Sequence, residues 1–244
     1  MRTGWLSRAG PYRIERLPCP YINRNIDLSV PPTGVVHTTE GGWNSAMSVF
    51  RRHYAPTFLV GVNRIAQLVP LGKMCAALEH PSGYPETNLI CRAQIEVVGF
   101  SSVQPYQFVT GTLDALAELL AVLETECEIP LRRNFPDAMP PLPWATRSFR
   151  RRRTGAWGTI SGWYGHVEVP GNSHWDPGAY RWAELLSLAI EKGAPPTYVY
   201  DIVVRNDKGQ ATSFSGIKHP GSKLKKYGVA QHDIVEFWGR RKRA

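Results

Sequence analysis

The spacing of hydrophobic and polar residues predicts three helices along the chain. In residues 112–128, leucines recur at steps of three and four residues and glutamates occupy the opposite face, as in an amphipathic helix. Residues 179–193 show a similar pattern, which ends at Gly193, a residue type that often closes helices. A third helix is expected within residues 39–55. Its predicted buried face carries Ala46, Val49 and Phe50.

Shorter apolar segments predict β-strands between these helices. The sequence TGVVH is expected to form a buried strand that ends at His37, and residues 92–100 alternate polar and apolar positions around Glu96. Residues 56–70 are predicted to form a hairpin around a tight Asn-Arg turn, and a further short strand is expected in GTISGWYGH. This mixture of helices and strands favours an α/β fold.

Two adjacent prolines, Pro195 and Pro196, mark a predicted domain boundary. The segment before it, residues 1–194, is expected to form the larger domain and includes an N-terminal extension, residues 1–30. Strand-like runs in residues 195–244 predict a small β-rich appendage, whose role the sequence does not reveal. The chain contains no internal repeat.

Composition adds a bias towards anionic partners. Of the 244 residues, 43% are apolar, which is enough for a hydrophobic core, and the formal net charge is +9 with a pI near 9.6. A basic protein favours partners such as nucleic acid, a membrane surface or an acidic cell wall. Much of the excess charge lies in RSFRRRR (147–153) and in the C-terminal sequence GRRKRA. Both runs suit solvated segments as well as a binding surface.

The cysteines exclude two common kinds of site. Cys19, Cys75, Cys91 and Cys127 are widely spaced, which excludes a CxxC redox site and a zinc ribbon and favours buried free thiols over disulfides. The first eighteen residues contain no continuous apolar segment. We therefore expect neither a signal peptide nor a membrane-spanning helix, and we expect synthesis in the cytoplasm without stable membrane insertion.

One short stretch, GHVEVPGNSHWDPG (165–178), concentrates side chains that can perform chemistry. Its glycines and prolines predict a stiff, irregular loop that can return on itself and direct His166 and Asp176 at one ion. His37, at a predicted strand end, supplies a second imidazole and thus a third donor. A catalytic zinc takes three protein ligands, and imidazole and carboxylate are both suitable. These spacings alone are not specific, and a purely structural role for each histidine stays open.

Four segments together resemble a known family. VVHTTEGG, PTFLVGVNRIAQLVPL, QIEVVGF and GHVEVPGNSHWDPG occur in the order of the motifs of type 2 N-acetylmuramoyl-L-alanine amidases. These are zinc amidases related to peptidoglycan recognition proteins, and the sequence looks most like the amidase endolysins of bacteriophages. The resemblance spans roughly residues 30–190. It implies a mixed β-sheet flanked by helices, with zinc in a groove at one edge.

The resemblance also implies roles for individual residues. His37, His166 and Asp176 would be the zinc ligands, and Glu96 would be the general base that transfers a proton to the leaving amine. His174 stands where many relatives carry lysine and would stabilise the developing oxyanion. Two alternatives stay open: His174 is itself a ligand, or Glu96 is an exposed strand residue. Many relatives also carry histidine at the position of Thr57 in this chain, a difference that we expect to affect only packing.

The implied activity is zinc-dependent hydrolysis of the amide bond between N-acetylmuramic acid and L-alanine in peptidoglycan. The alternative is a recognition protein of the same fold that binds peptidoglycan without cutting it, a class usually marked by loss of the third ligand. Nucleic-acid binding is not favoured, because the basic runs match no recognised binding motif. The absence of a signal suggests a phage lysin that reaches the wall through a separate membrane pore (a holin), or a host amidase that recycles wall fragments. The oligomeric state is unknown.

Overall fold

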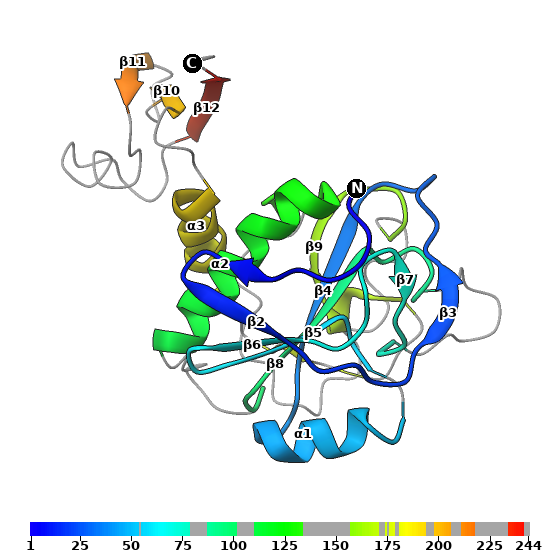
Figure 1. The fold of residues 1–244 in the computed structure, drawn as a ribbon. Helices are drawn as coiled ribbons and strands as arrows, with labels where there is room; N and C mark the ends of the chain where they lie inside the picture. The colour runs from blue at the N-terminus through cyan, green and yellow to red at the C-terminus, as the bar shows by residue number, and fades with distance from the viewer. Residues whose placement is uncertain are drawn as a thin grey trace. The chain divides into compact units, whose positions relative to one another are not determined.

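The computed structural model divides the chain into two compact units, Met1–Lys192 and Gly193–Ala244, each described by itself below (Figure 1). The structure describes residues 1–53, 55–78, 87–101, 110–133, 157–170, 174, 176–178, 181–193, 198–205, 211–217 and 234–241. The predicted arginine run, residues 147–153, lies outside these ranges.

A mixed sheet of seven strands forms the centre of the first unit. In spatial order it contains β1 (Arg8–Ala9), β2 (Tyr12–Arg16), β6 (Arg64–Gln67), β5 (Phe58–Gly61), β8 (Ala93–Val97), β4 (Thr33–Thr38) and β9 (Gly162–Gly165). The four neighbouring strands β5, β8, β4 and β9 all run parallel to one another. Strand β6 pairs with the other edge of β5 in an antiparallel hairpin. The predicted α/β fold with a mixed central sheet is therefore confirmed.

Three helices accompany the sheet: α1 (Trp43–Phe50), α2 (Thr110–Cys127) and α3 (Trp182–Gly193). Alternate residues of β5 show how the layers are arranged, because successive side chains of a strand point to opposite faces. Phe58 packs in the core cluster that contains the buried leucines of α2 and α3, whereas Leu59 packs with the buried residues of α1. The sheet is therefore covered by α2 and α3 on one face and by α1 on the other.

The predicted helices and hairpin occur in the structure, with two corrections. Val49 was expected on the buried face of the first helix, but its side chain is 47% exposed, while Ala46 and Phe50 are buried. The helix ends at Phe50, and its buried residues are Ala46, Met47 and Phe50. Its buried face is therefore narrower than the sequence pattern predicts. The helix predicted from residue 179 begins in the structure at Trp182.

The N-terminal extension contributes strands that the sequence did not suggest. Strand β2 pairs with β6 in parallel and buries Ile14, and β1 pairs with β2 at the edge of the central sheet. Strand β3 (Ile22–Asn25) pairs with β7 (Lys73–Met74) in a separate two-stranded sheet. The extension is thus part of the first unit and completes one edge of its main sheet.

The second unit contains a three-stranded antiparallel sheet. Its order is β11 (Ala211–Ile217), β10 (Tyr198–Arg205) and β12 (Ile234–Arg241). These strands cover the three strand-like runs seen in the sequence.

Two further expectations concern the whole chain. All four cysteines are buried and free, so the expected free thiols are present. Among the described residues, no helix combines the length and the apolar character needed to cross a membrane.

Candidate metal centre

The candidate site lies at the carboxyl ends of three neighbouring parallel strands. His37 is the penultimate residue of β4, Glu96 lies opposite it in register on β8, and His166 directly follows β9. Because parallel strands end at the same edge of a sheet, their last side chains meet there, as ligand sites in open α/β sheets commonly do. Three residues predicted from separate motifs are thus brought together by the strand order β8-β4-β9.

The loop after β9 returns on itself and brings Asp176 to this edge. The backbone N–H of Val167 donates to the carbonyl of Asp176 at 2.9 Å, which closes the loop at its base. Gly165 permits the close approach, because a Cβ at this position would lie 2.8 Å from Cδ of Pro177. The backbone N–H of Thr38 donates to Oδ2 of Asp176 at 3.2 Å, which fixes the carboxylate against the end of β4.

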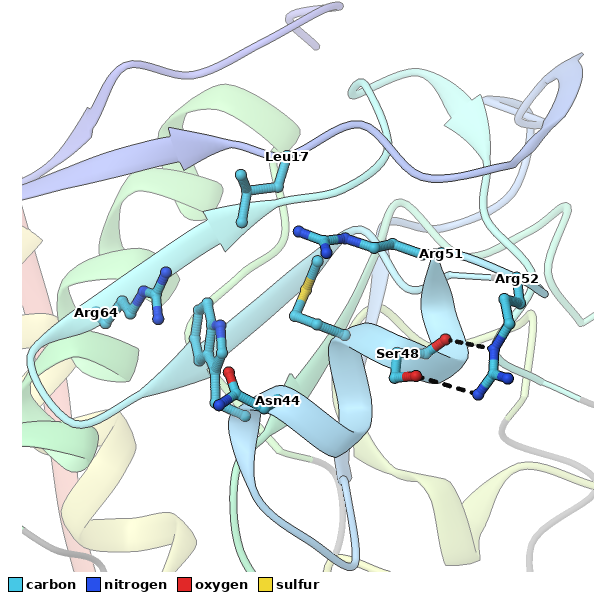
Figure 2. Close-up of a pocket in the computed structure, with 8 residues that line it drawn as sticks. Leu17, Asn44, Ser48, Arg51, Arg52 and Arg64 are labelled. Atoms are coloured by element: carbon cyan, nitrogen blue, oxygen red, sulfur yellow. Dashed lines mark hydrogen bonds between the residues drawn. The ribbon is translucent and has the colours of Figure 1, made fainter.

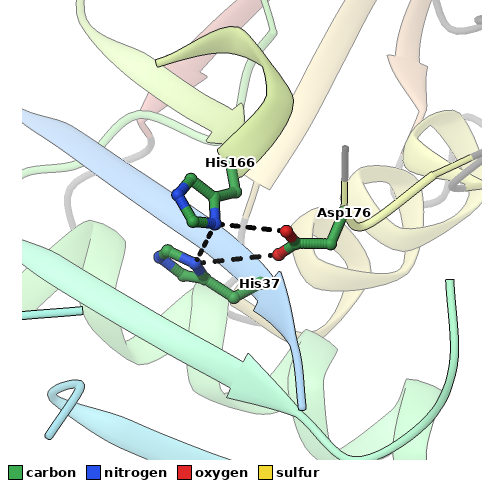
Figure 3. A group of neighbouring side chains, drawn as sticks. All are labelled: His37, His166 and Asp176. Atoms are coloured by element: carbon green, nitrogen blue, oxygen red, sulfur yellow. Dashed lines mark hydrogen bonds and ion pairs between the residues drawn. The ribbon is translucent and has the colours of Figure 1, made fainter. Parts of the chain in front are cut away.

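The three predicted ligands form one buried group (Figure 3). Nδ1 of His37 and Nδ1 of His166 lie 3.0 Å apart. Oδ1 of Asp176 lies 3.2 Å from Nδ1 of His166, and its Oδ2 lies 3.8 Å from Nδ1 of His37. Two imidazole nitrogens and one carboxylate therefore converge on a small common space.

These separations suit a tetrahedral zinc site. Zinc bonds of about 2.0–2.1 Å to nitrogen and oxygen place tetrahedral ligand atoms about 3.3 Å apart, which lies within the observed range of separations. Burial and the neighbouring His166 hold the pKa of His37 well below its usual value, which favours the neutral imidazole that binds metal. Burial alone would raise the pKa of Asp176, but His166 and His37 outweigh it and lower the pKa to about 2. The donor set thus consists of two imidazoles and a carboxylate, which are side chains that zinc accepts as ligands.

Glu96 lies beside this group. Burial, followed by the charges of Asp176 and Glu40, raises its pKa well above the usual value. Its Oε2 atom is buried and has no hydrogen-bond partner among the described residues. Glu96, His166 and Asp176 all line one pocket of about 410 Å³. A carboxyl group so placed can exchange a proton with a ligand in the pocket.

His174 lies at the mouth of the same pocket. Its ring stacks on the ring of His166 at a centroid distance of 4.4 Å, and its Nδ1 is 3.7 Å from Oδ1 of Asp176. Its side chain is 49% exposed. Among the described residues, the atoms close enough to share one ion come from His37, His166 and Asp176. This arrangement suits a donor to a bound substrate better than a third imidazole ligand.

Two further carboxylates, Glu168 and Glu40, lie near the site. The side chain of Glu168 is only 2% exposed and forms a two-pronged ion pair with Arg133. It also accepts the backbone N–H of Gly165 at 2.7 Å. Glu40 lines the pocket in a left-handed backbone conformation (φ 48°) and accepts hydrogen bonds from Thr38 and Ser101.

The Arg133–Glu168 pair holds the turn that presents His166. Arg133 lies 4.1 Å from the ring of Trp182 on α3, so the pair connects the loop after α2, the turn after β9 and a helix. Replacing Arg133 with methionine should lower the free energy of unfolding by about 3–5 kcal/mol, because it leaves the Glu168 carboxylate buried without its cation. Urea denaturation measures this change.

The neighbouring Arg132 provides the matched control for this variant. Arg132 is exposed and binds Ser161, so the same substitution there should cost less than about 1 kcal/mol. Equal losses of stability for the two variants would contradict the role assigned to the buried pair.

Two aromatic residues and Thr57 belong to the core of the sheet. Trp163 and Tyr164, both on β9, are fully buried, so neither ring is open for stacking on a ligand. Thr57 is also buried, and its hydroxyl group accepts the backbone N–H of Gln94 at 3.1 Å. Thr57 therefore serves packing and pairing within the sheet.

Comparison with known proteins shows similarity of fold. No protein-family model and no curated protein sequence matches this chain. The solved structure of the hydrolase AmiA of Staphylococcus aureus, in complex with its ligand, is similar over 74% of this chain and 83% of its own, with 16% identity and a TM-score of 0.50. A mutant endolysin from Bacillus subtilis is similar over 49% of this chain and 80% of its own, with 17% identity and a TM-score of 0.35. The similarity to AmiA shows that the two chains share a fold.

Proposed function

We propose that the chain is a zinc-dependent peptidoglycan hydrolase that cleaves the amide bond between N-acetylmuramic acid and L-alanine, as a phage endolysin does. The observation that carries the proposal is the buried group of His37, His166 and Asp176. Beside it lies the carboxyl group of Glu96, whose buried Oε2 has no hydrogen-bond partner among the described residues. The fold shared with a Staphylococcus aureus hydrolase and the resemblance of four sequence motifs to type 2 amidases support it.

His37, His166 and Asp176 would hold the metal, and Glu96 would manage the proton. When bound, zinc lowers the pKa of a coordinated water to about 7 and polarises the scissile carbonyl group. The Glu96 carboxylate accepts the proton of the attacking water. It later returns this proton to the nitrogen of L-alanine, so that the amine leaves in neutral form. A buried carboxyl group with a raised pKa is suited to both steps.

His174 would stabilise the negative charge that develops on the carbonyl oxygen. His174 lines the pocket with about half of its side chain exposed, while the stacked contact with His166 fixes the orientation of its ring. A donor oriented before the reaction contributes more to the transition state than one that must reorganise. Thr38 holds Oδ2 of Asp176, so the carboxylate keeps its position while the substrate reacts.

Hydrolysis is favoured over binding without cleavage because the third donor is present. Asp176 completes the set of three side chains, which leaves the fourth tetrahedral position open for water. We further propose that residues 1–194 form the catalytic domain and 195–244 a separate region. On this proposal the chain is made in the cytoplasm and acts on the cell wall after release through a membrane pore.

Analysis of the ends generated in purified peptidoglycan tests the function. Zinc-loaded protein should release new amino groups of L-alanine without new reducing sugars. Reducing ends without new amino groups would show glycosidase chemistry and contradict the proposal. Firm binding of peptidoglycan without new ends of either kind would instead identify a recognition protein.

The positive charge of the chain should make wall digestion sensitive to salt. The net charge of +9 attracts the anionic cell wall, and this attraction is screened at high ionic strength. Lysis of intact walls should therefore fall several-fold when salt is raised from about 0.05 M to 0.5 M. Hydrolysis of a small, soluble muropeptide provides the control and should change much less. Equal salt dependence for both substrates would contradict attraction by net charge.

A further inference from the structure

A second pocket, of about 530 Å³, is lined by residues of helix α1 and strand β6 (Figure 2). Ala46, Val49 and Phe50 of this helix line the metal-site pocket, whereas Trp43, Met47 and Ser48 line the second one. The two pockets therefore share the helix but present different side chains. The proposed hydrolysis uses none of the residues that line the second pocket.

Arginine side chains dominate the polar lining of this pocket. Arg51 and Arg52 follow directly after α1, and Arg64 begins strand β6. Among the described residues that line the pocket, none carries a carboxylate. Asn44 and Ser48 add neutral side chains that can donate hydrogen bonds.

The three arginines differ in how far their charges are already compensated. Arg64 donates two hydrogen bonds to Glu15, at 2.6 and 3.0 Å. Arg52 is bound only to neutral groups, the carbonyl and hydroxyl oxygens of Ser48. The guanidinium of Arg51 has no hydrogen bond or ion pair within the described part of the chain, and Figure 2 shows this side chain extending over the pocket towards Leu17. Within the described part of the chain, two positive charges of the pocket, those of Arg51 and Arg52, therefore have no acidic partner.

We propose that this pocket binds an oxyanion, a phosphate or a carboxylate, carried on a polyhydroxylated carbohydrate polymer. The guanidinium groups of Arg51 and Arg52 supply forked donors that match either oxyanion. Asn44 and Ser48 are placed to bind neighbouring hydroxyl groups of the same ligand. The volume lies within the range of pockets that hold small ligands or single polymer units.

The position of Trp43 argues against a nucleic acid as the ligand. The guanidinium of Arg64 lies 4.0 Å from the centre of its ring. A Cβ added to Gly61 would lie only 3.1 Å from the same ring, so Trp43 also packs closely against the backbone of β5. Binding of single-stranded nucleic acid usually relies on open aromatic faces that stack on bases. This pocket instead offers charges and hydrogen-bond donors.

Calorimetric titration of the full chain tests the proposal with two probes, poly(glycerol phosphate) and a short polygalacturonate. At about 0.15 M salt, where long-range attraction is screened, at least one probe should bind. The variant Arg51→Gln/Arg52→Gln should weaken that binding about tenfold or more, since each lost charge-assisted hydrogen bond contributes to affinity. A preference for the first probe identifies phosphate as the recognised group, and a preference for the second identifies carboxylate.

A matched control separates site binding from net charge. The variant Arg2→Gln/Arg24→Gln removes two exposed charges outside the pocket and should change the affinity less than about twofold. The single variant Arg51→Gln removes no described contact and serves if the double variant unfolds.

Equal weakening by the control pair, or unchanged binding after loss of Arg51, would overturn the proposal. Tighter, Arg51-dependent binding of an oligothymidylate would overturn the carbohydrate assignment. None of these measurements involves hydrolysis, so the outcome is independent of the proposed function.

Discussion

Replacing Asp176 with alanine should reduce hydrolysis of peptidoglycan by about a thousandfold or more and should remove most of the bound zinc. Asp176 provides the only carboxylate in the group of three donors and lies 3.2 Å from the nearest imidazole nitrogen. Its loss leaves two ligands for a metal that needs three, and the metal supplies several kcal/mol of transition-state stabilisation. Metal analysis of the purified variant and the initial rate of amino-group release measure both effects.

A second variant and a control make the Asp176 prediction specific. Asp176→Asn keeps the size of the side chain and the acceptor for the N–H of Thr38, so it should fold while binding zinc weakly. Asp27→Ala removes an aspartate that binds only Ser29, and it should retain both zinc and activity. An Asp176→Ala protein with full zinc content and full activity would show that the ligand assignment is wrong.

Replacing Glu96 with glutamine should lower kcat by roughly a hundredfold to ten-thousandfold, the usual contribution of a general acid or base. The amide keeps the shape of the side chain but cannot accept and return a proton. The zinc content should be unchanged, because Glu96 is not part of the group of three donors. KM should change little, since the residue acts on the reacting atoms rather than on binding.

The matched control for Glu96 is Glu126→Gln, which changes a partly buried glutamate paired with the exposed Arg2 and should leave kcat unaffected. The pH profile gives a second readout, because the limb that reports deprotonation of Glu96 should disappear in the variant. A kcat close to that of the parent chain would contradict the role of Glu96. Loss of zinc from the variant would instead assign Glu96 to the metal.

Local sequence patterns were sufficient for several elements that present the site, because His37 and Glu96 lie within short apolar strands and His166 directly follows one. His37 ends the run TGVVH, and Glu96 is flanked by Ile95 and Val97 in a strand that is buried on both faces. The order of these strands in the sheet follows from pairing between distant segments, which periodicity does not encode. The pattern of the loop 165–178 predicted that His166 and Asp176 share an ion with His37, and the family resemblance identified all three as ligands.

Features that depend on long-range partners were missed. Glu168 has the sequence context of a loop residue, and its burial depends on Arg133, 35 residues earlier in the chain. Strand β2 is short and mostly polar, and it is stabilised by parallel pairing with β6, about fifty residues later. The arginines of the second pocket likewise come together because α1 and β6 are adjacent in space. In each of these three cases, the partners lie too far apart in the sequence for a local pattern to link them.

The most direct test of the metal centre is a crystal structure with anomalous diffraction measured on both sides of the zinc absorption edge. One zinc peak is expected within about 2.0–2.2 Å of Nδ1 of His37, Nδ1 of His166 and one oxygen of Asp176, with Glu96 nearby but not bonded to the metal. A zinc-supplemented, active crystal with no peak at this position, or with the peak on other side chains, would contradict the account.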